Sequence, residues 1–394
     1  MKDRPGILGG EPTFSKKVQF MKPTLPEIDS LFNELTDSFK TGMLTKGQYL
    51  ERFEKKVSEY LGVRYAVGVS SCTSGLMLTC QALGLKGEVI VPSFTFMATI
   101  HSLIWNNLTP VFVDIEPDSF NLNPDLVKKR VTPKTSAIIP VHIFGNPVNI
   151  SALEDLAKEL NLKLIFDAAH GFGSFYNGHP LGRYGSSEVF SCSPTKLLVT
   201  GEGGIVATNE PELARRIRVG REYGNPGDYN SEFLGMNARM QEFSAILGLR
   251  SLEMLTESAK KRNEIVNLYK ERLGEIPGIS FQKINPLGKS SYKDFSILID
   301  LKKFGLTRDE LAFALEKENI QTRKYYFPPL HKHKALREFY KREYRLPVTE
   351  YISKNILSLP IYSHMQKDEV EGICQAIEKI HRFQKEIRRK SINL

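Results

Sequence analysis

The chain has 394 residues, of which 41% are hydrophobic and 25% charged, as in ordinary globular proteins. Its formal charge is +9, from 54 Lys and Arg against 45 Asp and Glu. This mild excess is compatible with nucleic acid, and equally with an anionic small substrate. No apolar run approaches the roughly 18 residues of a membrane helix, which argues against an integral membrane protein. The four cysteines form no CxxC pair or metal-binding spacing, so we expect neither a disulfide scaffold nor a metal site.

The first 30 or so residues are irregular and rich in Pro and Gly. They lack the apolar core of a signal peptide, so we expect a cytoplasmic protein. From about residue 26, apolar spacings near 3.6 predict a helix, and residues 50–61 form a second predicted helix.

Short apolar strands then alternate with helices. The strand-like runs are 65–70, 88–93, 109–115, 136–145, 162–169, 188–193 and 203–209. This alternation predicts an α/β fold with a mostly parallel sheet that is buried on both faces. Such sheets bind their ligands at the carboxyl ends of the strands, so the loops after the strands are the expected site of chemistry.

From about residue 238 the pattern changes to long helices, followed by strand-like runs and terminal helices. We therefore expect a large domain over 1–255, including the N-terminal segment, and a smaller α+β domain over 256–394. Near the end, Ile373, Ile377, Ile380 and Ile387 share one face of a predicted helix. The basic residues there are then the solvated face of a packed helix, and the alternative is a patch for nucleic acid or membrane.

Polar residues follow two of the early strands. Ser70 to Gly75 lead into a helix, whose free N–H groups and hydroxyl side chains suit a phosphate, although a plain helix N-cap would look the same. Phe96, in the loop PSFTF, can stack on a flat ring, although an aromatic residue there is often simply core.

Two charged residues follow later strands. Asp167 ends an apolar strand, where a carboxylate needs a cationic partner such as a protonated ring nitrogen, a salt bridge or a helix cap. Lys196 lies between a strand end and a Gly-rich turn, where burial would make it nucleophilic, unless it is an ordinary surface lysine. Together, a phosphate cradle, a stacking ring, a carboxylate and a lysine are what a pyridoxal phosphate site requires.

The sequence resembles the DegT/DnrJ/EryC1/StrS family of sugar aminotransferases, which are fold-type I pyridoxal phosphate enzymes. The resemblance runs from about residue 41 to about residue 380. The segments that carry it include VGVSSCTSGL, VIVPSFTFMAT, IIPVHIFGNPVNI, IFDAAHGFGSFYNG, FSCSPTKLLVTGEGGIVATN, LGMNARMQEFSAILG and YYFPPLHK. It implies an aspartate aminotransferase-like large domain and a smaller C-terminal domain.

The resemblance also implies roles for single residues. Lys196 matches the lysine that forms a Schiff base with the cofactor, Asp167 the partner of the pyridine nitrogen, and Phe96 the aromatic on the ring. The other implied cofactor contacts are Thr73, Ser74 and Ser191 at the phosphate, His170 near the phenolic oxygen, and Asn237 from the neighbouring subunit. The last match implies a homodimer with shared sites.

Two residues in YYFPPLHK match the border of the family's sugar-nucleotide pocket, and these are Tyr325 and His331. The chain also departs from the family, because Cys72 replaces the usual Gly of the phosphate loop and Leu197 replaces a common Asn. A branch of the family carries His in place of the lysine and dehydrates its sugar, and Lys196 argues against that branch.

The predicted activity is transfer of an amino group from glutamate to the keto group of a nucleotide-linked deoxysugar. It would serve surface polysaccharide, such as lipopolysaccharide, or a glycosylated metabolite. The alternatives are a keto-cyclitol acceptor and a non-catalytic regulator with this fold. The sequence leaves open which carbon is aminated and which base the nucleotide carries.

Overall fold

The computed structural model describes residues 4–340 and 342–392. Its large sheet has seven strands, in the spatial order β1 (Tyr65–Val69), β9 (Gly204–Thr208), β8 (Ser187–Ser191), β5 (Lys163–Asp167), β4 (Thr135–Ile138), β2 (Glu88–Pro92) and β3 (Thr109–Val113). Strand β9 is antiparallel to both neighbours, and every other neighbouring pair is parallel. The predicted α/β architecture with a mostly parallel sheet is confirmed.

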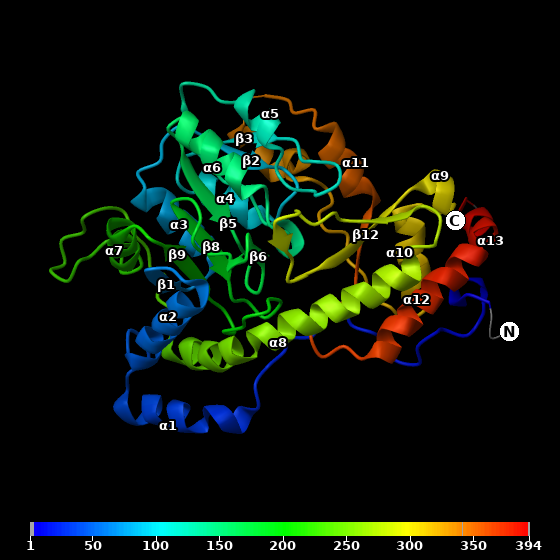
Figure 1. The fold of residues 1–394 in the computed structure, drawn as a ribbon, viewed down its shortest axis with the longest axis horizontal. Coiled ribbons are helices and arrows are strands. Elements are labelled where there is room, and N and C mark those ends of the chain that lie inside the picture. Colours follow the sequence, from blue (N-terminus) through cyan, green and yellow to red (C-terminus); the bar gives the residue numbers. More distant parts are fainter. Residues whose placement is uncertain (1–3, 341, 393–394) are drawn as a thin grey trace.

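The sheet is buried on both faces, as its apolar strands predict. Along β2, Val89 and Val91 belong to one core cluster while Ile90 belongs to another. The first cluster includes side chains from α3 (Cys72–Ala82), α4 (Met97–Ile104) and α7 (Pro211–Gly220). The second includes α2 (Gln48–Leu61), α6 (Ile150–Glu159) and the start of α8 (Glu242–Leu273). The loops that follow the parallel strands therefore lie at one edge of the sheet, and helices cover both of its faces (Figure 1).

The run predicted as a strand over 136–145 is shorter in the structure. Strand β4 ends at Ile138, and a 3-10 turn, η3 (Ile143–Gly145), follows it. Pro140 has no N–H to donate to a ladder, which ends the regular pairing close by. The segment after β4 is thereby released to bend over the sheet edge.

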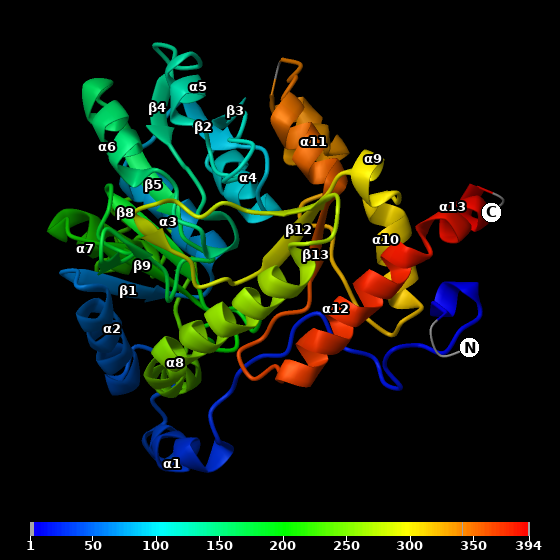
Figure 2. The same cartoon turned by 45° about the vertical axis from the view of Figure 1, so that its right-hand side comes forward.

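A smaller antiparallel sheet lies beside the large one. It consists of β10 (Ile279–Phe281), β12 (Phe295–Ile299) and β13 (Ile356–Leu359), packed with α10 (Arg308–Glu316) and α12 (Lys367–Arg382). Helix α8 crosses from the large sheet to this smaller part (Figures 1 and 2). The remaining elements are η1 (Gly6–Leu8), η2 (Ile28–Leu31), α1 (Phe32–Thr41), α5 (Pro124–Lys128), β6 (Phe175–Tyr176), β7 (His179–Pro180), β11 (Gly288–Lys289), α9 (Leu301–Phe304), η4 (Leu330–Lys332), η5 (Lys334–Phe339), α11 (Pro347–Asn355) and α13 (Gln384–Ile392).

The predicted division after residue 255 falls inside helix α8, and it stays a prediction. Along this helix, Ala259 still packs in the core of the large sheet, and Ile265 already packs in the core of the smaller one. The N-terminal segment differs from the predicted grouping, because Ile7 and Val18 also pack in the smaller core. Both described ends of the chain therefore lie beside the smaller part (Figure 2).

The basic tail is two helices, α12 and α13, with a break at Phe383, where one helix was predicted. The four isoleucines of the predicted apolar face are all fully buried. Arg382, Lys385, Arg388 and Arg389 are exposed on the other side, as a packed amphipathic helix requires. Across the described ranges, no helix has both the length and the apolar character to cross a membrane.

Candidate active site

The loops at the carboxyl edge of the large sheet enclose a cavity of about 340 Å³. It is lined by Ser71, Cys72, Thr73, Phe96, Ala98, Asp167, Ala169, His170, Ser191, Ser193, Thr195, Lys196, Glu202, Gly203, Lys293, Tyr325 and Tyr326. Most of these follow β1, β2, β5 and β8, the strand ends from which the sequence predicts chemistry. Lys293 and the two tyrosines come from the C-terminal half of the chain, so the cavity is closed by both parts of the molecule.

One wall of the cavity is the N-terminus of α3. Ser71 caps this helix, with its hydroxyl accepting the N–H of Ser74, and the Ser74 hydroxyl accepting the N–H of Ser71, both at 3.0 Å. Thr73 lines the cavity in the first turn, and Ser191 does so at the end of β8. Gly204 lets β9 lie close to the start of α3, because a Cβ at this position would lie 2.6 Å from the backbone nitrogen of Cys72. Ser74 itself is not among the residues that line the cavity, and its predicted contact with the phosphate stays a prediction.

Asp167 lies at the end of β5 and is almost fully buried. Its Oδ2 accepts the hydroxyl of Thr99 at 2.7 Å and its Oδ1 accepts the N–H of Ala169 at 3.1 Å. Burial nevertheless raises the pKa of this carboxyl above its usual value. Within the described ranges no ion pair joins it, so a carboxylate here calls for a cation from a ligand.

His170 presents a defined tautomer to the cavity. Its Nδ1 accepts the backbone N–H of Phe144 at 3.1 Å, so the proton of the neutral ring is on Nε2. Burial, together with the charges of Lys196 and Lys293, holds its pKa well below the ordinary value. The neutral ring therefore offers an N–H donor to a ligand.

Lys196 follows β8 and lines the same cavity. Burial, and then the nearby charge of Lys293, lowers the pKa of its ammonium to about 8. About a tenth of Lys196 is thus the neutral, nucleophilic amine at pH 7, far more than of an ordinary lysine. The surface-lysine interpretation is wrong for this residue.

Aromatic rings form the remaining wall. Phe96 lines the cavity with about half of its surface exposed, and its ring centroid lies 6.4 Å from that of Tyr326. Tyr325 and Tyr326 stack on each other at 5.1 Å. Phe96 is therefore positioned at the cavity mouth, where a flat ligand can lie against it.

Two of the predicted residues lie elsewhere. His331 is buried, with Nδ1 bonded to the hydroxyl of Ser93 at 2.7 Å and Nε2 3.1 Å from Glu350, and it does not line the cavity. Asn237 is exposed and also lies outside the cavity of its own chain. Its neighbour Ala238 accepts the N–H of Ser70 at 2.8 Å, so this segment runs beside the phosphate loop.

The sequence reasoning missed Lys293 and its partner Asp294. They form a buried ion pair, with N–O distances of 2.8 and 3.0 Å. A signal exists in the sequence, because two opposite charges directly precede the apolar run FSILI. Tyr326, Ser193, Thr195 and Glu202 were also missed, although each is within three residues of a predicted site residue or its Gly-rich turn.

The donor set fits pyridoxal phosphate. The start of α3 supplies hydroxyl and N–H groups for a phosphate, and Asp167 supplies a buried carboxylate that forms no direct ion pair among the described residues. Lys196 supplies the nucleophilic amine with which the cofactor's aldehyde can react. These three requirements lie around one cavity, in agreement with the predicted cofactor.

Comparison with known proteins leads to the same chemistry. Residues 27–378 match the profile of the DegT/DnrJ/EryC1/StrS aminotransferase family. The chain is 35% identical to dTDP-4-amino-4,6-dideoxy-D-glucose transaminase of Shigella dysenteriae, over 93% of this chain and 99% of that one. Among solved structures, DesI with its TDP-sugar product has a TM-score of 0.92 and 34% identity, covering 100% of this chain and 99% of that chain. DesV of S. venezuelae, in complex with a ketimine intermediate, has a TM-score of 0.85 and 31% identity, covering 94% and 99%. The chain belongs to the DegT/DnrJ/EryC1/StrS family and is a pyridoxal phosphate-dependent sugar aminotransferase.

Proposed function

We propose that this enzyme transfers an amino group from glutamate to the keto group of a nucleotide-linked deoxysugar. The observation that carries the proposal is the placement of Lys196, Asp167 and the α3 N-terminus around one cavity. The similarity to transaminases named for dTDP-sugars supports the nucleotide-sugar class of acceptor. A role in surface polysaccharide or glycosylated-metabolite synthesis, in the cytoplasm, follows from the sequence prediction.

Each residue has a part in this chemistry. The cofactor supplies an electron sink for the carbon that bears the amino group. Lys196 would hold the cofactor's aldehyde and, once the amino donor displaces it, would move a proton at the carbon that bears the amino group; its lowered pKa of about 8 favours both roles. Asp167 keeps the ring nitrogen of the cofactor protonated, because the protonated nitrogen offsets the cost of burying the carboxylate charge of Asp167.

The other contacts orient the ring. Thr73 and Ser191, with the backbone N–H groups of α3, hold the phosphate, and Phe96 covers one face of the ring. His170 donates its Nε2–H to the phenolic oxygen, a direction set by the bond from Phe144 to its Nδ1. Tyr325 lies on the cavity wall and contacts the sugar. His331 bonds Ser93, three residues before Phe96, and so holds the loop that carries Phe96.

The enzyme works as a homodimer with shared sites, in which Asn237 of one subunit reaches the phosphate of the other. Asn237 is exposed, and the segment before it carries exposed apolar side chains, among them Tyr223, Tyr229 and Leu234. An exposed apolar surface beside a polar residue fits burial against a second copy.

An absorbance scan before and after the addition of glutamate tests the proposal. The expected result is a visible band of the bound cofactor that glutamate converts to the shorter-wavelength amine form. A panel of amino-sugar nucleotides and an amino-cyclitol then identifies the acceptor by the reverse reaction. Reaction of the cyclitol alone would overturn the nucleotide-sugar assignment, and absence of the band after added pyridoxal phosphate would contradict the role of Lys196.

A further inference from the structure

A buried and internally neutralised cation lines the cavity next to Lys196. The ammonium of Lys293 lies 2.8 and 3.0 Å from the two carboxylate oxygens of Asp294, and the two residues are 5% and 3% exposed. Arg262 of α8 fixes the backbone here, donating to the carbonyl of Lys293 at 2.9 Å. The pair is therefore built into the wall and does not belong to a mobile surface.

Lys293 retains a donor for a ligand. An ammonium has three N–H donors, and the two oxygens of Asp294 accept two of them. Lys196 is reserved for the cofactor, so Lys293 is the remaining cation among the described side chains that line the cavity. The pair also offers an acceptor, because each Asp294 oxygen has more than one lone pair.

This inference rests on the proposed function, which requires this wall of the cavity to bind two ligands of different charge in turn. An amino-acid donor brings a carboxylate into the cavity, and a sugar ring with neutral hydroxyls later occupies the same space. A lone buried cation would suit the first ligand, but beside the second its charge would be left uncompensated, which is costly in a buried site. A cation with its own counter-charge avoids this cost and can share its bonds with either ligand.

We infer that Lys293 and Asp294 form a dual-recognition site, in which Lys293 binds the carboxylate of the amino donor and the pair together binds hydroxyl groups of the sugar. With the donor bound, one or more N–H groups of Lys293 turn to the carboxylate. With the sugar bound, Lys293 donates to one hydroxyl oxygen and Asp294 accepts a hydroxyl proton.

Calorimetry with two unreactive probes tests this on the cofactor-loaded protein. Glutarate supplies the carboxylates without an amino group, and dTDP-glucose supplies a neutral sugar ring on a nucleotide. Replacement of Lys293 by Met should weaken glutarate binding by roughly tenfold or more, the loss expected for a charge-assisted hydrogen bond. It should weaken dTDP-glucose binding less, by about threefold, because there it removes one bond to a neutral hydroxyl. The matched control is Lys289→Met, four residues away on the exposed β11, which should alter neither.

Asp294→Asn should act in the opposite sense. It removes the counter-charge from Lys293, so glutarate should bind at least as tightly as to the wild type, and dTDP-glucose should bind more weakly. Lys293→Gln, which keeps a donor but no charge, serves as a second variant if Lys293→Met unfolds. Loss of both ligands to the same degree in Lys293→Met, or of neither, would overturn the inference. Failure of the wild-type protein to bind pyridoxal phosphate would instead count against the proposed function.

Discussion

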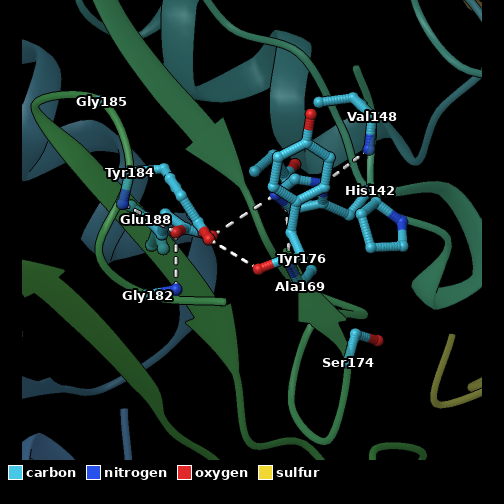
Figure 3. Close-up of polar contacts among 12 residues, drawn as sticks. His142, Val148, Ala169, Ser174, Tyr176, Gly182, Tyr184, Gly185 and Glu188 are labelled. Carbon is cyan, nitrogen blue, oxygen red and sulfur yellow. Dashed lines mark hydrogen bonds and ion pairs between the residues drawn. The ribbon is translucent and has the colours of Figure 1, made fainter. Parts of the chain in front are cut away.

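Nε2 of His142 and Oε2 of Glu188 lie 3.4 Å apart at a point where neither side chain has exposed surface (Figure 3). Nδ1 of His142 accepts the N–H of Val148 at 3.2 Å, so the proton of the neutral ring is on Nε2 and faces Glu188. The ring also stacks on Phe166, with centroids 5.2 Å apart.

The contact between His142 and Glu188 is linked to the cofactor cavity by the segment 142–148. By accepting from Val148, His142 closes the segment 142–148, which contains the backbone N–H of Phe144. That N–H fixes the tautomer of His170. Glu188 thus positions a cavity residue that it does not touch.

Removal of this buried carboxylate should destabilise the protein strongly. Oε1 of Glu188 accepts the N–H groups of Gly182 and Tyr184, so Glu188→Ala strands two backbone donors as well as His142. The free energy of unfolding should fall by about 3–5 kcal/mol, because each buried donor left without an acceptor costs about 1–3 kcal/mol. Urea unfolding measures this.

The matched control is Glu154→Ala, because Glu154 accepts the N–H of the neighbouring Gly185 at 3.0 Å in an exposed position. It should cost roughly 1 kcal/mol or less. Equal losses in the free energy of unfolding for the two variants would show that the buried bonds of Glu188 stabilise the protein no more than the exposed bond of Glu154.

The fold and most of the cavity could be predicted because both depend on local sequence patterns. Strand ends, the glycines of the turn after Lys196 and the apolar face of the tail are all visible in a single segment. The cap formed by Ser74 could not be predicted, because a Ser at the third position of a helix can serve a cap or a ligand, and only the structure shows its bond to Ser71.

Lys293 and His331 depend on long-range packing, which the sequence does not display. The backbone of Lys293 is held at the cavity by a bond from Arg262 of α8. The ring of His331 bonds Ser93, which is 238 residues away in the sequence, and does not face the cavity. The predicted boundary after residue 255 falls inside α8 for the same reason, since one continuous helix contributes to two cores.

Thr99→Val should move the acid limit of cofactor binding to higher pH. Burial raises the pKa of Asp167, and the hydroxyl of Thr99 gives the largest opposing contribution, so its loss raises that pKa further. Binding that needs the carboxylate is present above its pKa and is lost as the pH falls through it. The acid limb should therefore shift upward by roughly 1–2 pH units, the equivalent of one hydrogen bond to a charged group.

A titration of pyridoxal phosphate binding against pH, followed by absorbance, measures that limb. Ser102→Ala is the control, because the Ser102 hydroxyl is buried in the same helix and donates to the carbonyl of Thr99, at 2.8 Å, instead of to Asp167. An unchanged limb in Thr99→Val would mean that Asp167 does not govern cofactor binding.

Capture of pyridoxal phosphate by the cofactor-free protein should report the pKa of Lys196. The neutral amine is the nucleophile, so the rate should rise with pH through about 8 and then level off. An ordinary lysine would keep gaining rate towards pH ~10.4. Stopped-flow absorbance measures the profile, and Lys196→Arg, which cannot form the bond, gives the background. A rate that still rises steeply above about pH 9 would contradict the lowered pKa.

The shared-site dimer predicts that two inactive variants restore each other. Lys196→Ala removes the reactive amine, and Asn237→Asp puts a negative charge where the neighbouring subunit's phosphate should lie, so each homodimer should be inactive. A mixed dimer, however, combines the lysine of one subunit with the asparagine of the other in one intact site. With random exchange, half of the dimers are mixed and each has one working site of two, so about a quarter of wild-type activity should return. Lys196→Ala mixed with the double variant Lys196→Ala/Asn237→Asp contains no intact site and is the control. If exchange is verified by differently tagged subunits and no activity returns, Asn237 serves its own chain or no site at all, and the shared-site arrangement is wrong.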